Sequence, residues 1–174
     1  MTSAKGYTTE QYLLDRAHIH DTLTYIYYAA DSREWDLLLT HVLAPEVTID
    51  YSEYFGWEPT TRTAKEQQKV WEDVTNPMPK TQHVITSIIP VLPAPGANTS
   101  IPEKAQAKAN VFVHLSKKLE NGETIKTRNG GRMEAELTRH PDLAEKSNGN
   151  PWRLSGFKAY AGFDENGAEF WGTK

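Results

Sequence analysis

The chemistry that this sequence can support rests on a few isolated titratable side chains. Asp31 lies where a predicted N-terminal helix ends, and His83 opens a predicted strand. An aspartate at a helix C-terminus is disfavoured by the helix dipole by about 0.3–1 kcal/mol, and residues that break a local rule are candidates for function. Histidine is the side chain best suited to proton transfer near neutral pH. The two residues therefore predict general acid–base chemistry.

Each of these residues also has a purely structural interpretation. Asp31 can cap the short helix that follows it, because aspartate is favoured at helix N-caps. A single histidine beside apolar residues is more often a hydrogen-bonded core residue than a catalytic one. The sequence leaves both alternatives open.

Aromatic residues gather around the same elements. Tyr27 lies one helical turn before Asp31, so its hydroxyl could share a pocket with that carboxylate. Tyr51 ends the first predicted strand. The aromatic residues expected to shape an apolar pocket for a small molecule are Tyr27, Tyr54, Phe55, Trp71, Phe112 and Phe157.

Three polar residues on later strands are further candidates for substrate binding. His114 shares a strand face with Phe112, and Arg132 and Glu134 share a face of the next strand. The residues that alternate with Arg132 and Glu134 are apolar, so simple patterning sends the polar face to solvent. A sheet that lines a cavity can instead bury polar residues on its inner side, and this alternative stays open.

The composition excludes several classes of site. The 174 residues include no cysteine, which rules out disulfides, thiolate nucleophiles and cysteine-ligated zinc. The formal charge is 19 − 23 = −4 without a basic stripe, so nucleic acid and anionic membranes are poor partners. No metal-ligand spacing, dinucleotide fingerprint or phosphate loop is present, so we expect no metal and no cofactor. The charged first thirty residues and the lack of an apolar span predict a cytoplasmic protein with a small-molecule substrate.

The hydrophobic pattern predicts helices first and strands afterwards. An amphipathic helix is expected over 10–30, with Leu13 on its apolar face, and a short helix over 33–42 that Pro45 stops. A strand is expected over 47–51. A capping box at 63–66 opens a third helix to about 75, expected to bury Val70, Trp71 and Val74.

The second half of the chain alternates as strands do. Strands are expected over 81–92, 105–119, 124–137 and 152–163, with loops at 93–102 and 138–150 and a hairpin turn at Asn121-Gly122. Asn129-Gly130-Gly131 within the third of these strands indicates a bulge or a bend that curves the sheet. Helices followed by a meander of strands predict a single α+β domain over 1–174.

Several segments resemble the SnoaL-like family of the NTF2-like superfamily, and scytalone dehydratase within it. They are Ala-Ala-Asp-Ser-Arg-Glu-Trp-Asp at 29–36, Leu-Ala-Pro at 43–45, Ile-Asp-Tyr at 49–51, Lys-Thr-Gln-His at 80–83, and the tryptophan-led strand at 152–158. The resemblance implies a cone-like, curved antiparallel sheet packed on N-terminal helices around a cavity, an α+β barrel. It also implies a dimer or trimer.

The resemblance assigns roles to three residues. Asp31 and His83 fall on the family's catalytic carboxylate–imidazole pair, and Tyr51 on a tyrosine that orients a substrate carbonyl or water. Two departures argue against scytalone itself as substrate: the tyrosine before the aspartate is Ala30 here, and a serine and an asparagine of the penultimate strand are replaced by glutamates, the first being Glu134.

The function expected on these grounds is a cofactor-independent dehydratase acting on a polyketide, terpenoid or steroid-like molecule. An isomerase or cyclase of secondary metabolism that uses the same pair is the alternative within enzymes. A non-catalytic binding module of the same fold is the alternative outside them. Epoxide hydrolysis by an aspartate–arginine–aspartate arrangement is a further possibility, with Arg132 as the arginine.

Overall fold

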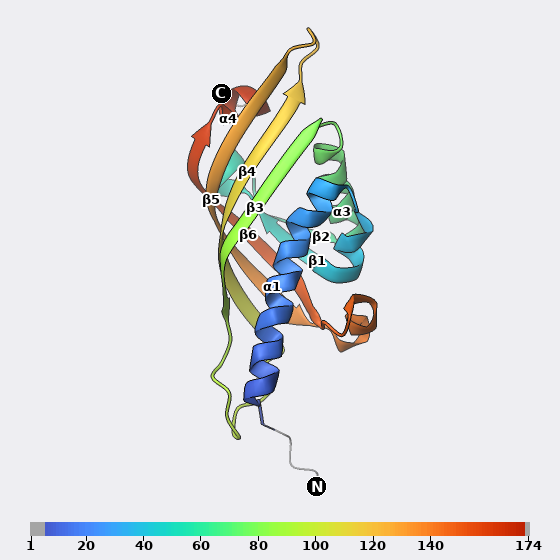
Figure 1. Cartoon of the computed structure of the whole chain (residues 1–174), viewed down its shortest axis with the longest axis vertical. Helices are drawn as coiled ribbons and strands as arrows, with labels where there is room; N and C mark the ends of the chain where they lie inside the picture. The colour runs from blue at the N-terminus through green and yellow to red at the C-terminus, as the bar shows by residue number, and fades with distance from the viewer. Residues whose placement is uncertain (1–5, 173–174) are drawn as a thin grey trace.

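The helices lie mainly on one side of a single curved sheet (Figure 1). The computed structural model describes residues 6–172. Its helices are α1 (Thr9–Ser32), the π-helix η1 (Leu38–Val42), α2 (Ser52–Phe55), α3 (Ala64–Thr75), the 3-10 helix η2 (Pro141–Ser147) and α4 (Gly167–Trp171). Its strands are β1 (Leu43–Asp50), β2 (Thr60–Thr63), β3 (Lys80–Val91), β4 (Lys104–Lys118), β5 (Thr124–Arg139) and β6 (Trp152–Glu165).

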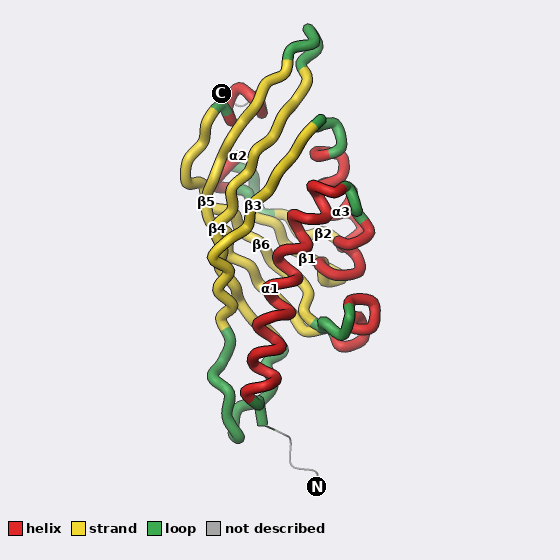
Figure 2. Tube along the Cα trace, viewed as in Figure 1, coloured by secondary structure: helices red, strands yellow, loops and turns green. Residues whose placement is uncertain are grey.

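The six strands run in the order β2-β1-β6-β5-β4-β3. The expected α+β class is confirmed, and the sheet curves without closing, so β2 and β3 remain its edges. β1 and β6 pair in parallel, whereas the other neighbours are antiparallel. Figure 2 shows α1 and α3 over one face, called here the inner face; the opposite face, called the outer face, carries no helix along β4 and β5.

Helix α1 is fixed at both ends. The Thr8 side chain accepts a hydrogen bond from the Gln11 backbone N–H at its start, and Arg33 in the left-handed region (φ 65°) ends it. Its buried face contains Asp15, Ile19, Leu23, Ile26 and Ala29. Leu13 is 59% exposed, so the expectation that it belongs to the apolar face is wrong. A buried polar residue, Asp15, lies on that face instead.

Helix α3 begins with the predicted capping box. The Thr63 hydroxyl accepts from the Glu66 backbone N–H, and the Glu66 carboxylate accepts from the Thr63 backbone N–H. The buried face differs from the expected one, because Val70 and Val74 are exposed. Gln67 and Thr75 are buried and Trp71 packs against the core, at helical spacing from one another.

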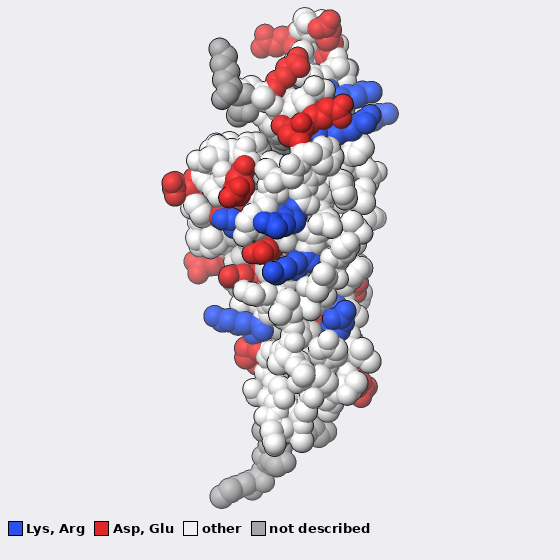
Figure 3. Space-filling view, turned by 90° about the vertical axis from the view of Figure 1, so that its left-hand side faces the viewer, with Lys and Arg blue, Asp and Glu red and all other residues white. Residues whose placement is uncertain are grey.

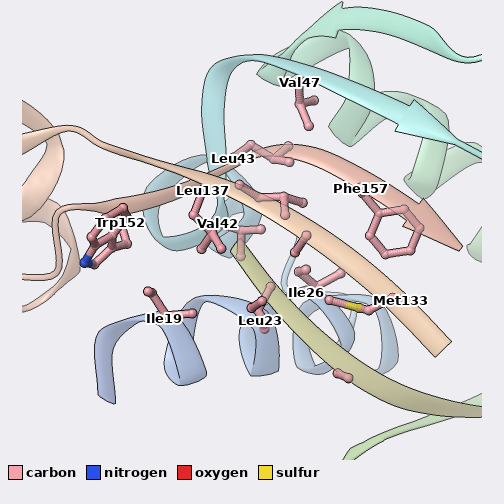
Figure 4. Close-up of a cluster of buried hydrophobic side chains, with 14 of the residues drawn as sticks. Ile19, Leu23, Ile26, Val42, Leu43, Val47, Met133, Leu137, Trp152 and Phe157 are labelled. Carbon is pink, nitrogen blue, oxygen red and sulfur yellow. The ribbon is translucent and has the colours of Figure 1, made fainter. Parts of the chain in front are cut away.

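The core lies between α1 and the inner face of the sheet. Figure 4 shows Ile19, Leu23 and Ile26 pointing from α1 toward side chains of β1, β5 and β6. Within β4 and β5 the inner residues are buried and the alternate ones exposed, which is the pattern of a half-covered sheet. Each methylene group buried in this interface stabilises the fold by about 0.8 kcal/mol.

The irregularity predicted at Asn129-Gly130-Gly131 is confirmed, but the bulged residue lies on the partner strand: Gly130 pairs with Phe163 and Gly131 with Ala161, which leaves Gly162 of β6 unpaired. The register with β6 shifts between Gly130 and Gly131. A Cβ on Gly130 would lie 2.5 Å from the Phe163 ring, and one on Gly131 would lie 2.7 Å from the Tyr54 hydroxyl. These glycines therefore let the strand bend and let Tyr54 approach the inner face of β5.

A buried carboxylate ties the opposite end of α1 to the sheet. Asp15 is fully buried and accepts hydrogen bonds from Arg139 (2.6 Å), Tyr7 (2.9 Å), Gln11 (3.0 Å) and the Trp152 indole N–H (3.0 Å). The guanidinium of Arg139 also lies over the Trp152 ring, 4.5 Å from its centroid. Because every partner is a donor, this cluster anchors the helix rather than offering a free base.

No helix within residues 6–172 has both the length and the apolar character needed to span a membrane.

Candidate active site

The end of α1 and the start of β3 bring Asp31 and His83 together. Asp31 Oδ1 lies 2.7 Å from His83 Nδ1, and Asp31 Oδ2 accepts the His83 backbone N–H, also at 2.7 Å. The Gln82 side-chain amide donates to the same Oδ2 at 3.3 Å. An ionised carboxylate can only accept hydrogen bonds, so the imidazole carries its proton on Nδ1 and leaves the Nε2 lone pair free.

Both side chains are shielded but reachable. The exposed fraction is 18% for the Asp31 side chain and 16% for that of His83. Burial acts to raise the pKa of Asp31, but the hydrogen bonds from the ring and backbone N–H groups of His83 outweigh it, so the pKa lies below its ordinary value. The carboxylate is therefore ionised at neutral pH and stabilises a protonated imidazole.

Arg33 joins the two elements that carry the pair. Its guanidinium donates to the Ala30 carbonyl at the end of α1, to the Met78 carbonyl (3.1 Å) and to the Thr81 hydroxyl (3.0 Å). The Thr81 oxygen accepts from Arg33, so its own proton is available to Asp31, whose pKa it helps to lower. The cation also offsets the unfavourable dipole at the helix end.

Tyr27 covers one side of the imidazole. Its ring is stacked on that of His83, with centroids 5.3 Å apart and an angle of 25° between the planes. Its hydroxyl lies 3.2 Å from the sulfur of Met133 on β5. Burial raises the pKa of this phenol well above its ordinary value, so it remains neutral and acts as a donor.

Tyr51 and its aromatic neighbours lie on the same inner side. The Tyr51 ring contacts Phe157 (5.4 Å between centroids) and Phe55 (6.0 Å), and it packs with Tyr54 and Trp71 against the core. Burial raises the pKa of Tyr51 to about 12, while the Trp71 side chain acts in the opposite direction. Six expected site residues besides the pair therefore belong to the inner side: Tyr27, Tyr51, Tyr54, Phe55, Trp71 and Phe157.

Four expected substrate-binding residues lie elsewhere. Phe112, His114, Arg132 and Glu134 are exposed and belong to the outer face of β4 and β5. Tyr160 donates to Glu134 (3.0 Å), and the Arg132 guanidinium lies 4.7 Å from the centroid of the same ring. The expectation that these four residues line the substrate site is therefore wrong. Strand alternation sends every second side chain away from the helices, and these four point that way. Arg132 also cannot join Asp31 in an epoxide-hydrolysing arrangement.

The outer face has a groove of its own. It encloses about 420 Å³ and is lined by residues of β1, β4, β5 and β6, among them Asp50, Lys108, Glu134 and Lys158. Figure 3 shows acidic and basic side chains mixed across this face. The groove contains neither Asp31 nor His83, so it is distinct from the candidate active site.

No group of three or more His, Asp or Glu side chains that could hold a metal ion occurs within the described residues.

Sequence reasoning did not single out Arg33, Thr81 and Gln82, which hold the pair in place. Their positions beside Asp31 and His83 were the available signal. Which of their atoms meet depends on the left-handed turn at Arg33 and on where β3 pairs with β4, and neither is visible in the sequence.

An open, curved sheet with helices over its inner face, and an aspartate–histidine pair between the end of α1 and the start of β3, define a class of small α+β proteins. Residues 11–158 match the model of the SnoaL-like domain, and the chain belongs to that family. No curated protein matches the sequence.

Solved structures support the same fold. The Kfla4162 protein from Kribbella flavida has a TM-score of 0.73 and 23% identity, over 89% of this chain and 95% of that one. A candidate scytalone dehydratase from Novosphingobium aromaticivorans has a TM-score of 0.68 and 12% identity, over 91% of both chains. A type 2 hexachlorocyclohexane dehydrochlorinase has a TM-score of 0.64 and 15% identity, over 88% and 89%. The chain thus has an NTF2-like fold that it shares with proteins named for elimination reactions.

Proposed function

We propose that this protein is a cofactor-independent dehydratase that acts by general acid–base catalysis on a small polyketide, terpenoid or steroid-like molecule. The observation that carries the proposal is the pair of 2.7 Å hydrogen bonds that joins Asp31 to the ring and backbone nitrogens of His83. A neutral imidazole whose tautomer is fixed by a buried carboxylate is suited to remove a proton and to return it.

The reaction can be written with His83 as the only proton carrier. Its Nε2 removes a proton from the carbon next to a carbonyl, and the electron pair moves onto the carbonyl oxygen as an enolate. The enolate then expels the hydroxyl group on the adjacent carbon, which receives the proton from Nε2 and leaves as water. A carbon–carbon double bond forms, and the imidazole returns to its starting state.

The other inner residues support this sequence of steps. Asp31 stabilises the imidazolium that forms in the first step. Tyr51 is neutral because its pKa is raised to about 12, and it donates a hydrogen bond to the oxygen on which charge develops. Tyr27, Tyr54, Phe55, Trp71 and Phe157 supply the apolar surface that a fused or flat ring system needs.

The names of similar solved structures favour elimination over isomerisation as the proposed reaction. Two of the three solved structures reported above are named for elimination reactions, one as a candidate dehydratase and one as a dehydrochlorinase. An isomerase or cyclase would use the same proton transfers without expelling a leaving group. A non-catalytic module would carry out no proton transfer and no elimination.

A panel of cyclic β-hydroxy ketones in D₂O separates these functions. A dehydratase gives a product lighter by one water. An isomerase gives deuterium at carbon without that loss, and a binding module gives neither change. We expect Asp31→Asn and His83→Gln to abolish the loss of water while circular dichroism remains unchanged. Full activity in both folded variants would remove the proposal.

We also propose that the protein forms a homo-oligomer, a dimer or trimer, through its outer face. Phe112 and Phe163 are 40% and 52% exposed there, with ring centroids 6.2 Å apart. Sedimentation of the parent and of Phe163→Asp tests this; a parent that sediments as a monomer contradicts it.

A further inference from the structure

The side chain of Gln82 bends round the free edge of the sheet. Strand β3 has a neighbouring strand on one side only, and alternation along it sends His83 to the inner face and Gln82 to the outer face. Gln82 is exposed, yet its amide nitrogen lies 3.3 Å from Asp31 Oδ2 at the end of α1. The imidazole and the amide, from opposite faces of β3, therefore meet one carboxylate at the edge of the sheet.

The neighbouring acceptors fix which way the Gln82 amide points. The same nitrogen lies 3.5 Å from the His83 carbonyl oxygen, so both of these neighbours are acceptors. An amide nitrogen can only donate a hydrogen bond, and an amide oxygen can only accept one. The nitrogen therefore belongs on the carboxylate side, and the amide oxygen points away from it.

Stability alone does not explain this contact. Fixing a long side chain at the surface costs rotamer entropy, and one exposed hydrogen bond offsets that cost only in part. The contact does restrain the carboxylate. Two N–H groups, from the Gln82 amide and the His83 backbone, hold Oδ2 of Asp31, while Oδ1 faces the imidazole at 2.7 Å. A rotation that exchanged the two oxygens would break both bonds to Oδ2.

We propose that Gln82 is a positioning residue that acts through Asp31 on His83 and sets the pH range in which the imidazole works as a base. The inference rests on the proposed function and adds to it a residue that does not touch the substrate. The Gln82 N–H stabilises the ionised carboxylate and draws part of its charge away from the ring. Activity therefore extends to lower pH than an aspartate–histidine pair without this donor would allow.

Three other charged or titratable side chains lie around Gln82. They are Arg33 on the turn after α1, His114 opposite Gln82 on β4, and Arg128 opposite His114 on β5. Arg33 donates to two carbonyls and a hydroxyl, and the other two side chains lie on the outer face. None of the three donates to Asp31 within residues 6–172, so Gln82 is the residue that joins the carboxylate to the outer face.

The pH profile of kcat/KM tests the inference. Gln82→Glu keeps the shape of the side chain but puts a carboxyl in place of the amide that lies 3.3 Å from Asp31 Oδ2. The added negative charge stabilises the imidazolium, so we expect the acidic limb of the profile to move up by about one pH unit.

Gln82→Met removes the donor without adding a charge. It should lower kcat/KM by about 3–10-fold, the equivalent of one lost hydrogen bond, and move the limb in the same direction by less. Circular dichroism should remain that of the parent for both variants. A uniform loss of activity at every pH, with the limb in place in both variants, would overturn the inference, because a purely structural role predicts that result.

Gln106→Glu is the matched control. Gln106 is also an exposed glutamine on the outer face of the sheet. It lies 114 − 106 = 8 residues along β4 from His114, the partner of Gln82, or about 26 Å at roughly 3.3 Å per residue. We expect its profile to match the parent. A limb that moves as far in Gln106→Glu as in Gln82→Glu would assign the effect to net charge and contradict the inference.

Imidazole ¹⁵N signals, read through the carbon-bound ring protons, supply a readout that needs no substrate. They report which ring nitrogen carries a proton, and His83→Gln identifies the signals of interest among the six histidines. We expect Gln82→Glu to move the titration of these signals to higher pH and Gln106→Glu to leave it in place. A titration that Gln82→Glu does not move would remove the proposed role.

The two proposals fail in different ways. If Asp31 and His83 prove dispensable for turnover, the proposed reaction is lost, while the ¹⁵N titration still shows whether Gln82 acts on the pair. If the titration ignores Gln82, the dehydratase proposal stands and only the role of Gln82 is lost.

Discussion

The ring of Tyr27 lies against the imidazole of His83, one turn of α1 before the aspartate that holds the same imidazole from its edge. The histidine is therefore fixed in two directions by one helix. Asp31 sets its tautomer, and Tyr27 sets the plane in which Nε2 points. A base on an edge strand gains from this arrangement, because β3 has only one neighbouring strand to restrain it.

Removal of the Tyr27 ring should therefore impair catalysis more than removal of its hydroxyl. We expect Tyr27→Leu to lower kcat by about 10–100-fold, since a small misplacement of a reacting group is costly. Tyr27→Phe keeps the stacking and loses only the weak contact with Met133, so kcat should fall about threefold or less. Turnover of the β-hydroxy ketone that the parent dehydrates is the measurement. If Tyr27→Phe lowers kcat as much as Tyr27→Leu does, the stacking of Tyr27 on His83 is not the cause of the loss.

Arg33 should matter to the site although it does not touch a substrate. Arg33→Lys keeps the charge but loses the fork that reaches Ala30, Met78 and Thr81. At roughly 0.5–1.5 kcal/mol for each hydrogen bond lost, we expect urea denaturation to show a loss of about 1–3 kcal/mol. The value of kcat should fall as well, because Asp31 is no longer held toward β3.

Arg128→Lys is the matched control for that change. Its ion pair with Glu165 spans 3.9 Å between exposed side chains, and such pairs contribute about 0–1 kcal/mol. Stability and kcat should both stay close to the parent values. An Arg33→Lys protein indistinguishable from the Arg128→Lys protein would mean that the turn after α1 positions Asp31 unaided.

The order and class of the elements could be predicted from the sequence because they depend on local patterns. The capping box at Thr63, the Asn121-Gly122 turn and the register shift at Gly130-Gly131 each carry their own signal. The short elements β2 and α2 have no such local sequence signal, because four residues are too few to show a helical or strand periodicity.

The site could be predicted only in part. The meeting of Asp31 and His83 was expected from the family resemblance, while simple alternation already favoured solvent for Glu134. Phe112 and His114 were misplaced because a strand pattern gives two faces without saying which one the helices cover. Val70 and Val74 were misplaced for a related reason. Hydrophobicity ranked them above Gln67 and Thr75, but the direction of α3 against the sheet decided which side is buried.

The stability of the protein should depend on pH through Asp31. Folding lowers the pKa of this carboxyl, so the ionised form is favoured in the folded state. Its contribution is present above the unfolded pKa, near the ordinary value of 3.8, and is lost as the pH falls through the lower folded value. We expect the difference in unfolding free energy between the parent and Asp31→Asn to persist at pH 5 and to shrink below about pH 4.

Urea denaturation at a series of pH values measures that difference. Asp21→Asn is the control, because its carboxylate lies on the same helix and is 61% exposed. It should alter stability little at any pH. A gap between the parent and Asp31→Asn that stays constant down to pH 2 would contradict the direction of the shift.

The cluster around Asp15 should govern stability independently of the site. Arg139→Met leaves a fully buried carboxylate with only neutral donors, and breaking a buried pair on one side costs about 3–5 kcal/mol. The double variant Asp15→Asn/Arg139→Met should recover part of this loss, because no uncompensated charge remains in the core. Thermal and urea unfolding measure both. At a temperature where Arg139→Met is still folded, its kcat should match that of the parent, since the cluster lies at the end of α1 remote from Asp31. A loss below about 1 kcal/mol would show that Tyr7, Gln11 and Trp152 satisfy Asp15 without the arginine.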